Sequence, residues 1–243
     1  MPSLTPEDPH PAANNEALLV PSRVLLHGAS LLVRLPSPIG MSVIEWYPCF
    51  IDVEASGFGP ASWPVSLAWC DHAGEIRRCL IRPLPQWTYW DEQAESVHGI
   101  DRARLDSEGL APAEVAARLQ ADLKGMLAFS DAPDFDAAWL ATLYRGLGRP
   151  MPFSLDHADD LLVGAMLRPG EVLWQAQARL DGVKEELRAT AKGRHDAGYD
   201  VGFLVALWRK ALGETVKMNH GIGPVPEVTA TGSFKRPEAA AGG

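Results

Sequence analysis

Three short runs of mainly apolar residues, separated by polar and glycine-containing segments, predict three consecutive strands in the first half of this chain. Residues 46–53 are rich in aromatic and β-branched side chains and lead to Gly57 and Gly59, as at the end of a strand. Residues 64–70 and 75–81 have the same character, and the Asp-His-Ala-Gly segment between them is typical of a turn. Because the connections are short, we expect an antiparallel meander.

Helical periodicity follows the predicted strands. From Pro112, a favourable first-turn residue, apolar side chains recur at helical spacing as far as Met126 and Leu127, where a predicted strand competes with the end of the helix. Residues 126–130 predict a short strand, and residues 136–147 and 198–212 predict two further helices, each followed by a glycine. Strands succeeded by helices indicate a mixed α/β fold.

Composition divides the chain into a folded part and two ends. Apolar residues make up 47% and charged residues 22% of the 243 residues, which suits one globular domain. Residues 1–44 lack periodicity, and residues 214–243 are punctuated by glycine and proline. We therefore expect a poorly ordered N-terminal extension, a folded domain at 45–213 and a flexible C-terminal tail.

The cysteine pattern and the hydropathy of the chain indicate in which cellular compartment the protein is expected. Cys49, Cys70 and Cys79 form neither a paired framework nor a CxxC motif, which argues against a structural zinc site and suits a reduced compartment. No run approaches the roughly 20 apolar residues of a membrane helix. No basic segment precedes the short apolar patches near the N-terminus, so we expect a cytoplasmic protein without membrane association.

The net charge of −9 bears on the choice of partner. It counts against a tight, non-specific nucleic-acid binder, because such proteins usually have a basic surface. It does not exclude a nuclease that recruits divalent cations, since that site must gather carboxylates and bound metal reverses the local sign.

Asp52 and Glu54 are the first candidate metal ligands. Residues two apart on a strand point to the same face, so these carboxylates lie side by side while Ile51 and Val53 face the buried side. Two neighbouring carboxylates repel each other, and Mg²⁺ or Mn²⁺ relieves this because hard cations take oxygen ligands. The alternative is a pair of acids at a solvated strand edge.

An acidic segment runs directly into one of the predicted helices. Asp131, Asp134 and Asp136 are all candidates for helix-start caps, which the helix dipole favours. The functional alternative is that Asp136 projects a carboxylate from the first helical turn toward the same cations.

A third pattern surrounds the start of the last helix. His195 precedes this helix and Asp200 lies inside it, after the flexible Gly193-Arg194 step. The ordinary pKa of histidine suits it to accept a proton from a metal-bound water near neutrality. The alternative is a surface histidine beside a capping aspartate.

The three patterns occur together, in one order along the chain. D-x-E on the first strand, F-D at a middle helix and H-x-A-x-x-D at the last helix resemble the DEDDh 3′→5′ exonucleases (DnaQ-like and RNase T-like) of the ribonuclease-H-like superfamily. The segments Ser56-Gly57-Phe58 and Val97-His98-Gly99-Ile100 also look like this family. The resemblance covers roughly residues 47–212.

The resemblance implies a fold, a cofactor and a reaction. The expected fold is α/β: a ribonuclease-H-like mixed sheet, made of a three-strand antiparallel meander plus parallel strands, flanked by helices. Two Mg²⁺ or Mn²⁺ ions would be bound by Asp52, Glu54, Asp136 and Asp200, with His195 as the general base. The reaction would release nucleoside 5′-monophosphates from a 3′ end of DNA or RNA, with a single-stranded end expected and a homodimer as one alternative for the assembly.

The second motif departs from the family pattern. Family members often have H-N-x-x-F-D, where this chain has D-A-P-D-F-D. Asp131 or Asp134 therefore competes with Asp136 for the metal role.

Several other residues have two interpretations. The resemblance implies substrate-binding roles for Ser56, Phe58 and His98. The aromatic cluster of Trp87, Tyr89 and Trp90 could stack on unpaired bases, with packing in the core as the alternative. We interpret His157, which lies among Asp156, Asp159 and Asp160, as part of a capped helix start rather than a second metal site.

Two functions compete with the exonuclease. A catalytically silent module that binds nucleic acid or protein on the same fold is motivated by the acidic charge and the altered second motif. A metal-dependent endonuclease of the wider superfamily is disfavoured, since those enzymes lack the H-x-A-x-x-D ending. A circular substrate distinguishes the latter, because an exonuclease leaves a circle intact.

Overall fold

The computed structural model describes residues 47–190 and 195–213, together with the backbone of five short strands outside these ranges. Most of the segments predicted to be poorly ordered, 1–44 and 214–243, lie outside the described residues. Within the described part, no helix combines the length and apolar character needed to cross a membrane.

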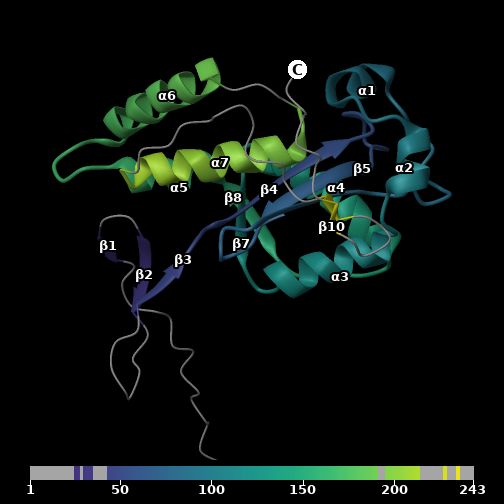
Figure 1. The fold of residues 1–243 in the computed structure, drawn as a ribbon, viewed down its shortest axis with the longest axis horizontal. Coiled ribbons are helices and arrows are strands. Elements are labelled where there is room, and N and C mark those ends of the chain that lie inside the picture. Colours follow the sequence, from purple (N-terminus) through teal and green to yellow (C-terminus); the bar gives the residue numbers. More distant parts are fainter. Residues whose placement is uncertain are drawn as a thin grey trace, which may run out of the picture.

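A seven-stranded sheet with the order β10-β9-β6-β5-β4-β7-β8 forms the centre of the fold (Figure 1). Its strands are β4 (Cys49–Ala55), β5 (Pro64–Cys70), β6 (Ile76–Leu80), β7 (Leu127–Ser130), β8 (Ser154–His157), β9 (Glu227–Val228) and β10 (Phe234–Lys235). The remaining strands form a second sheet: β1 (Leu25–His27), β2 (Ser30–Arg34) and β3 (Val43–Trp46).

Strand directions confirm the predicted mixed sheet. β4, β5 and β6 pair antiparallel as a meander, whereas β7 runs parallel to β4 and β8 parallel to β7. The strand predicted at 46–53 is displaced: Trp46 ends β3, and β4 begins at Cys49. Pro48 separates the two strands, since proline has no N–H to donate to a ladder.

Helices cover both faces of the sheet (Figure 1). They are α1 (Glu92–His98), α2 (Arg102–Glu108), α3 (Pro112–Leu123), α4 (Pro133–Gly146), α5 (Ala158–Met166), α6 (Leu173–Thr190) and α7 (Ala197–Ala211). One core packs Ile51 and Val53 of β4 against α3 and α4, and the other packs Phe50 against α5 and α7. The alternation along β4 therefore turns Asp52 and Glu54 away from the core that contains Ile51 and Val53, as predicted.

One helix begins earlier than predicted, and another lacks the predicted side-chain cap. α4 starts at Pro133 rather than at Asp136, because proline is preorganised for the first helical position. The residue before it is Ala132, and no side-chain hydrogen bond caps the helix, so the capping interpretation of the acidic segment is wrong. A helix start at His157 was predicted and is found, since α5 begins at Ala158, but no side-chain hydrogen bond caps it.

The aromatic cluster is largely structural. Trp87 is buried and stacks on Trp63, with ring centroids 5.6 Å apart and an interplanar angle of 14°. The indole N–H of Trp90 donates to Glu95 at 2.5 Å, and its ring packs against the same core. Trp87 and Trp90 thus follow the packing alternative.

Candidate active site

Three carboxylates converge where β4 meets α7. Asp52 and Glu54 come from β4, and Asp200 comes from the first turn of α7. One oxygen from each lies within 4.8 Å of the others. Segments nearly 150 residues apart in the sequence are joined because α7 packs its apolar face across β4 and β5.

Asp136 is the fourth acid of the same site. It projects from the first turn of α4 and is only 2% exposed. The hydroxyl of Ser130, at the end of β7, donates a hydrogen bond to Asp136 Oδ2 and accepts one from the N–H of Ala132 at 2.9 Å. Asp136 lines the pocket but does not belong to the tight trio of acids.

The pocket around these acids, which we call the acid pocket, has a cavity volume of about 200 Å³. Its lining includes the five residues predicted as catalytic: Asp52, Glu54, Asp136, His195 and Asp200. Asp131 also lines it, whereas Asp134 lines the adjoining groove with Phe58 and Arg145. Of the two acids that competed with Asp136, only Asp131 therefore reaches the acid pocket.

His195 lies at the mouth of this pocket in an uncommon backbone conformation. Its φ is 65°, and among the described residues it is the one non-glycine residue with a positive φ. Histidine is one of the residues that tolerate this region, although it is sparsely populated. The side chain is exposed, so it is accessible to a substrate or to water.

The residue after His195 is held by two contacts. Asp196 Oδ1 accepts the N–H of Tyr199 at 3.0 Å, which caps α7. Asp196 Oδ2 accepts a hydrogen bond from Arg78 of β6 at 2.8 Å. Sequence reasoning missed Arg78, because the two residues are 118 positions apart and no local pattern connects them.

Phe58 belongs to an aromatic wall beside the acids. It is 72% exposed, and its ring lies 5.7 Å from Phe135 at 83° and 6.0 Å from Trp139. All three side chains line the acid pocket. Phe135 and Trp139 were missed in the sequence, although their spacing of four places them on one face of α4.

The turn that presents Phe58 is fixed by Ser56 and Gly57. Ser56 is fully buried; its N–H donates to the Trp63 carbonyl at 2.9 Å and its Oγ accepts the Trp63 N–H at 3.2 Å. Gly57 has a φ of 151°, and an added Cβ would come within 2.8 Å of the Tyr89 ring. The side chain of Ser56 therefore stabilises the turn and does not line the acid pocket.

His98 also lies outside the acid pocket. Its Nδ1 accepts the N–H of Ile100 at 3.0 Å, and its ring meets Trp90 edge-on at 6.2 Å. Burial lowers its pKa. The structure thus brings Phe58 to the acids, whereas the side chains of Ser56 and His98 lie outside the lining of the acid pocket.

Crowding of carboxylates governs the electrostatics. Burial, together with the charges of Asp136, Asp200 and Glu54, raises the pKa of Asp52 well above its usual range. Burial and the charge of Asp200 raise the pKa of Glu54 to about 7. Burial raises the pKa of Asp136 to about 8, although the Ser130 hydrogen bond opposes this. The negative charges of these carboxylates are therefore not neutralised by the other side chains of the site.

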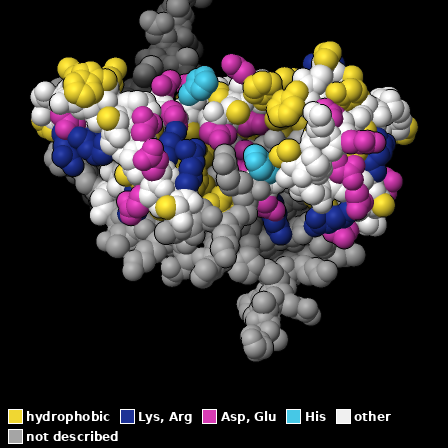
Figure 2. Space-filling view, turned by 90° about the horizontal axis from the view of Figure 1, so that it is seen from above, with side chains coloured by type: hydrophobic (Ala, Val, Ile, Leu, Met, Phe, Trp, Pro, Cys, Tyr) yellow, Lys and Arg dark blue, Asp and Glu magenta, His cyan; other side chains and the backbone are white. Residues whose placement is uncertain are grey.

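Figure 2 shows acidic side chains gathered near the middle of one face of the molecule. Basic side chains lie beside them on one side, and hydrophobic side chains lie on the other.

No family model matches the sequence, and no curated protein matches it significantly. Solved structures do match. The zinc-bound complex of E. coli exonuclease I with single-stranded DNA is 18% identical, with a TM-score of 0.50 over 66% of this chain and 39% of that one. Exonuclease I from Methylocaldum szegediense is 22% identical over 66% of this chain and 39% of that one, with a TM-score of 0.48.

The nuclease domain of 3′hExo, a DEDDh family member bound to rAMP, is 16% identical, with a TM-score of 0.48 over 68% of this chain and 90% of that domain. This chain spans about two fifths of exonuclease I, since 39% of that protein is covered. The expected architecture is confirmed: the chain has the ribonuclease-H-like α/β fold found in exonuclease I, and it resembles the DEDDh exonucleases in the order of its motifs.

Proposed function

We propose that this protein is a metal-dependent 3′→5′ exonuclease. The observation that carries the proposal is the convergence of Asp52, Glu54 and Asp200, whose oxygens lie within 4.8 Å of one another. Buried Asp136 and exposed His195 line the same pocket. These are the five positions that match the family motifs.

The donor set fits divalent cations of the Mg²⁺ or Mn²⁺ type. Carboxylate oxygens are the ligands that such hard cations take, and no thiol or imidazole belongs to the trio. The raised carboxyl pKa values of Glu54 and Asp136 show a charge imbalance that cations would correct. Two bound cations would lower the pKa of the attacking water and stabilise charge on the phosphoryl oxygens.

The side chains of the chain itself then have distinct roles. Asp52, Glu54, Asp136 and Asp200 hold the cations. His195 accepts the proton of the attacking water, for which its exposed position at the pocket mouth leaves room. The product is a nucleoside 5′-monophosphate, and the leaving group is the 3′ oxygen of the shortened strand.

The aromatic wall supports a single-stranded substrate. Phe58, Phe135 and Trp139 present ring surface directly beside the acids, and rings stack on bases that are unpaired. We assign the terminal base to this wall, with Phe58 as the most exposed contact. E. coli exonuclease I, which shares the fold, has been solved with single-stranded DNA.

A gel assay on 5′-labelled single-stranded DNA and RNA, with Mn²⁺, Mg²⁺ or EDTA, tests this function. The proposal predicts a metal-dependent ladder that shortens from the 3′ end, with a single-stranded circle left intact. Cutting of the circle would indicate an endonuclease. Binding of the strand without shortening, by protein shown to be folded, would indicate the silent binding module.

A further inference from the structure

A second pocket adjoins the acid pocket. It lies between α5, α6 and α7, has a cavity volume of about 80 Å³, and shares Asp131 and Asp200 with the acid pocket. We call it the α6 pocket. It is lined by Asp131, Asp159, Lys184, Arg188, Tyr199, Asp200, Phe203, Leu204 and Leu207.

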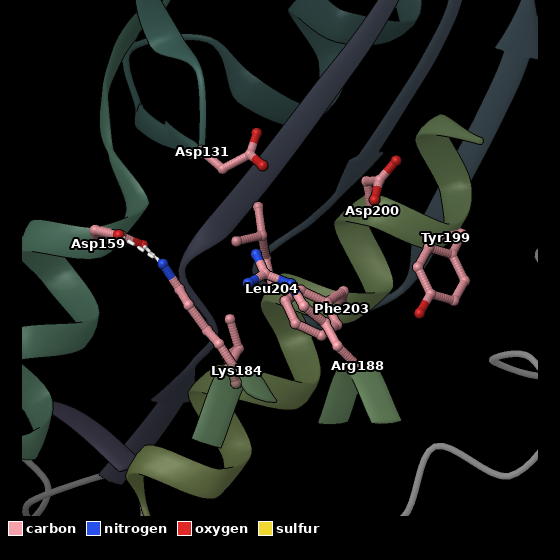
Figure 3. A pocket seen from close by; sticks show the side chains of 9 residues that line it. Asp131, Asp159, Lys184, Arg188, Tyr199, Asp200, Phe203 and Leu204 are labelled. Atoms are coloured by element: carbon pink, nitrogen blue, oxygen red, sulfur yellow. Dashed lines mark hydrogen bonds and ion pairs between the residues drawn. The ribbon is translucent and has the colours of Figure 1, made fainter. Parts of the chain in front are cut away.

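Two cationic side chains of α6 enter this pocket (Figure 3). Lys184 and Arg188 are four residues apart and therefore share one face of the helix. The ammonium group of Lys184 lies 2.6 Å from both carboxylate oxygens of Asp159 on α5. This ion pair connects α6 to α5 one helical turn away from Arg188.

Arg188 is placed differently from Lys184. Its guanidinium carbon lies 5.6 Å from the centre of the Phe203 ring, and in the part of the chain that the structure describes it forms no ion pair. Figure 3 shows the guanidinium in the middle of the pocket, with Asp131 and Asp200 above it. Burial raises the pKa of Asp131, and the charges of Lys184 and Arg188 oppose that rise.

The chemistry of this group favours a phosphate ligand. A guanidinium offers parallel N–H donors that match two phosphate oxygens, and it is more weakly hydrated than an ammonium. The apolar side chains of Phe203, Leu204 and Leu207 line the same pocket, and Arg188 itself is exposed, so its guanidinium is accessible to a ligand. The chain as a whole has a net charge of −9, so a cationic group beside the acids is not explained by its overall composition.

The arrangement of the two pockets gives the substrate a direction. The aromatic wall lines the acid pocket and Arg188 lines the α6 pocket, and the two pockets meet at Asp131 and Asp200. If the terminal base stacks on the wall and the scissile phosphate lies over the acids, the remaining strand continues toward the α6 pocket. The next phosphate on the 5′ side is the anion that would reach Arg188.

We propose that the α6 pocket binds the phosphodiester on the 5′ side of the scissile one, with Arg188 as its main donor. This inference rests on the proposed exonuclease function. Arg188 contributes to binding of a strand with at least two nucleotides, and it has no partner on a substrate that contains only the terminal nucleotide.

The test compares two substrates. One is a short single-stranded DNA, and the other is the p-nitrophenyl ester of thymidine 5′-monophosphate, which has a scissile phosphate but no upstream one. Arg188→Gln is expected to lower kcat/KM on DNA by about 10- to 100-fold, as for loss of a charged hydrogen bond, with a much smaller loss on the ester. Arg149→Gln, which changes an exposed arginine outside both pockets, serves as the matched control.

A modified strand sharpens the result. Replacing the upstream phosphodiester by a neutral methylphosphonate should cost the wild type about as much as Arg188→Gln does, and should cost the Arg188→Gln variant little more. Arg188→Lys should recover part of the loss, because it keeps the charge without the planar fork. Thermal unfolding of each variant checks that it is folded.

Three outcomes would overturn the assignment. Equal losses on both substrates would place Arg188 at the scissile phosphate. Behaviour identical to that of Arg149→Gln would leave the α6 pocket without a substrate role. Failure of the wild type on both substrates would refute the exonuclease function itself, and the subsite with it.

Discussion

Arg78 and Asp196 join the edge of the meander to the start of α7 through a hydrogen-bonded ion pair of 2.8 Å. The pair lies next to His195, whose φ of 65° departs from the ordinary helix entry. Asp196 also caps α7 by accepting the N–H of Tyr199. Its carboxylate therefore connects the residue after His195 both to β6 and to the first turn of α7. The ion pair therefore helps to position the candidate general base.

Arg78→Met should reduce catalysis more than stability. The two side chains are 29% and 49% exposed, so loss of the pair should cost about 1 kcal/mol of unfolding free energy or less. Displacement of His195 should lower kcat on the order of tenfold with KM nearly unchanged. Steady-state kinetics on single-stranded DNA and a thermal melt measure the two effects.

Arg104→Met is the control for this experiment. It breaks a comparable pair with Glu108, 3.0 Å long and with side chains 38% and 50% exposed, on α2. Equal kcat values for the two variants would show that Arg78 does not position His195. Partial recovery in Arg78→Lys would support the ion pair over a packing role.

Phe58→Ala should weaken substrate binding. Base stacking is worth about 1–3 kcal/mol per base, so KM for single-stranded DNA should rise about tenfold. The melting temperature should hardly change, because the ring is 72% exposed. Trp174→Ala removes a ring that is 69% exposed on α6 and lies outside the acid pocket. If both variants changed KM equally, the stacking role would be wrong.

Stability without metal should fall as pH rises. The folded protein holds protons on Glu54 up to about pH 7 and on Asp136 up to about pH 8, whereas an unfolded carboxyl loses its proton near pH 4. The folded state therefore binds more protons than the unfolded state between these values, and its stability decreases across that range. Melting temperatures in EDTA should be lower at about pH 8.5 than at about pH 5.

Mn²⁺ should act in the opposite direction. The carboxylates must be deprotonated to bind it, so the rise in melting temperature that Mn²⁺ causes should be larger at about pH 8.5. Asp52→Asn should raise the melting temperature in EDTA at that pH by about 3 °C, since it removes one repelling charge, and should reduce the effect of Mn²⁺. A Mn²⁺ effect of equal size at both pH values would contradict the metal assignment.

The four candidate metal-binding acids were predictable because each belongs to a local pattern. Period-two alternation on β4 gives the common direction of Asp52 and Glu54, and the F-D and H-x-A-x-x-D spacings mark helix starts. The start of α4 was misplaced by three residues even though Pro133 is itself a start signal. Asp136 nevertheless remains in the first turn, so its role as a candidate ligand was unaffected.

The positions of Arg188 and Arg78 beside the site could not be predicted from local patterns. Arg188 reaches the α6 pocket because α6 packs on α5 and α7, and these contacts join distant segments. α6 is a polar helix whose sequence gave no distinct apolar stripe. Arg78 is likewise recognisable only through its contact with Asp196. Tertiary packing, and not local propensity, brings these cations to the site.

One comparison tests the central claim most directly: shortening of 5′-labelled single-stranded DNA by wild type, Asp200→Asn and Asp106→Asn, each in Mn²⁺ and in EDTA. Asp106 is an exposed acid on α2 and controls for the change of charge. Wild type and Asp106→Asn should degrade the strand from its 3′ end in Mn²⁺ only. Asp200→Asn should be slower by about 10³-fold or more while its melt remains cooperative. Undiminished shortening by purified Asp200→Asn, or shortening that persists in EDTA, would contradict the account.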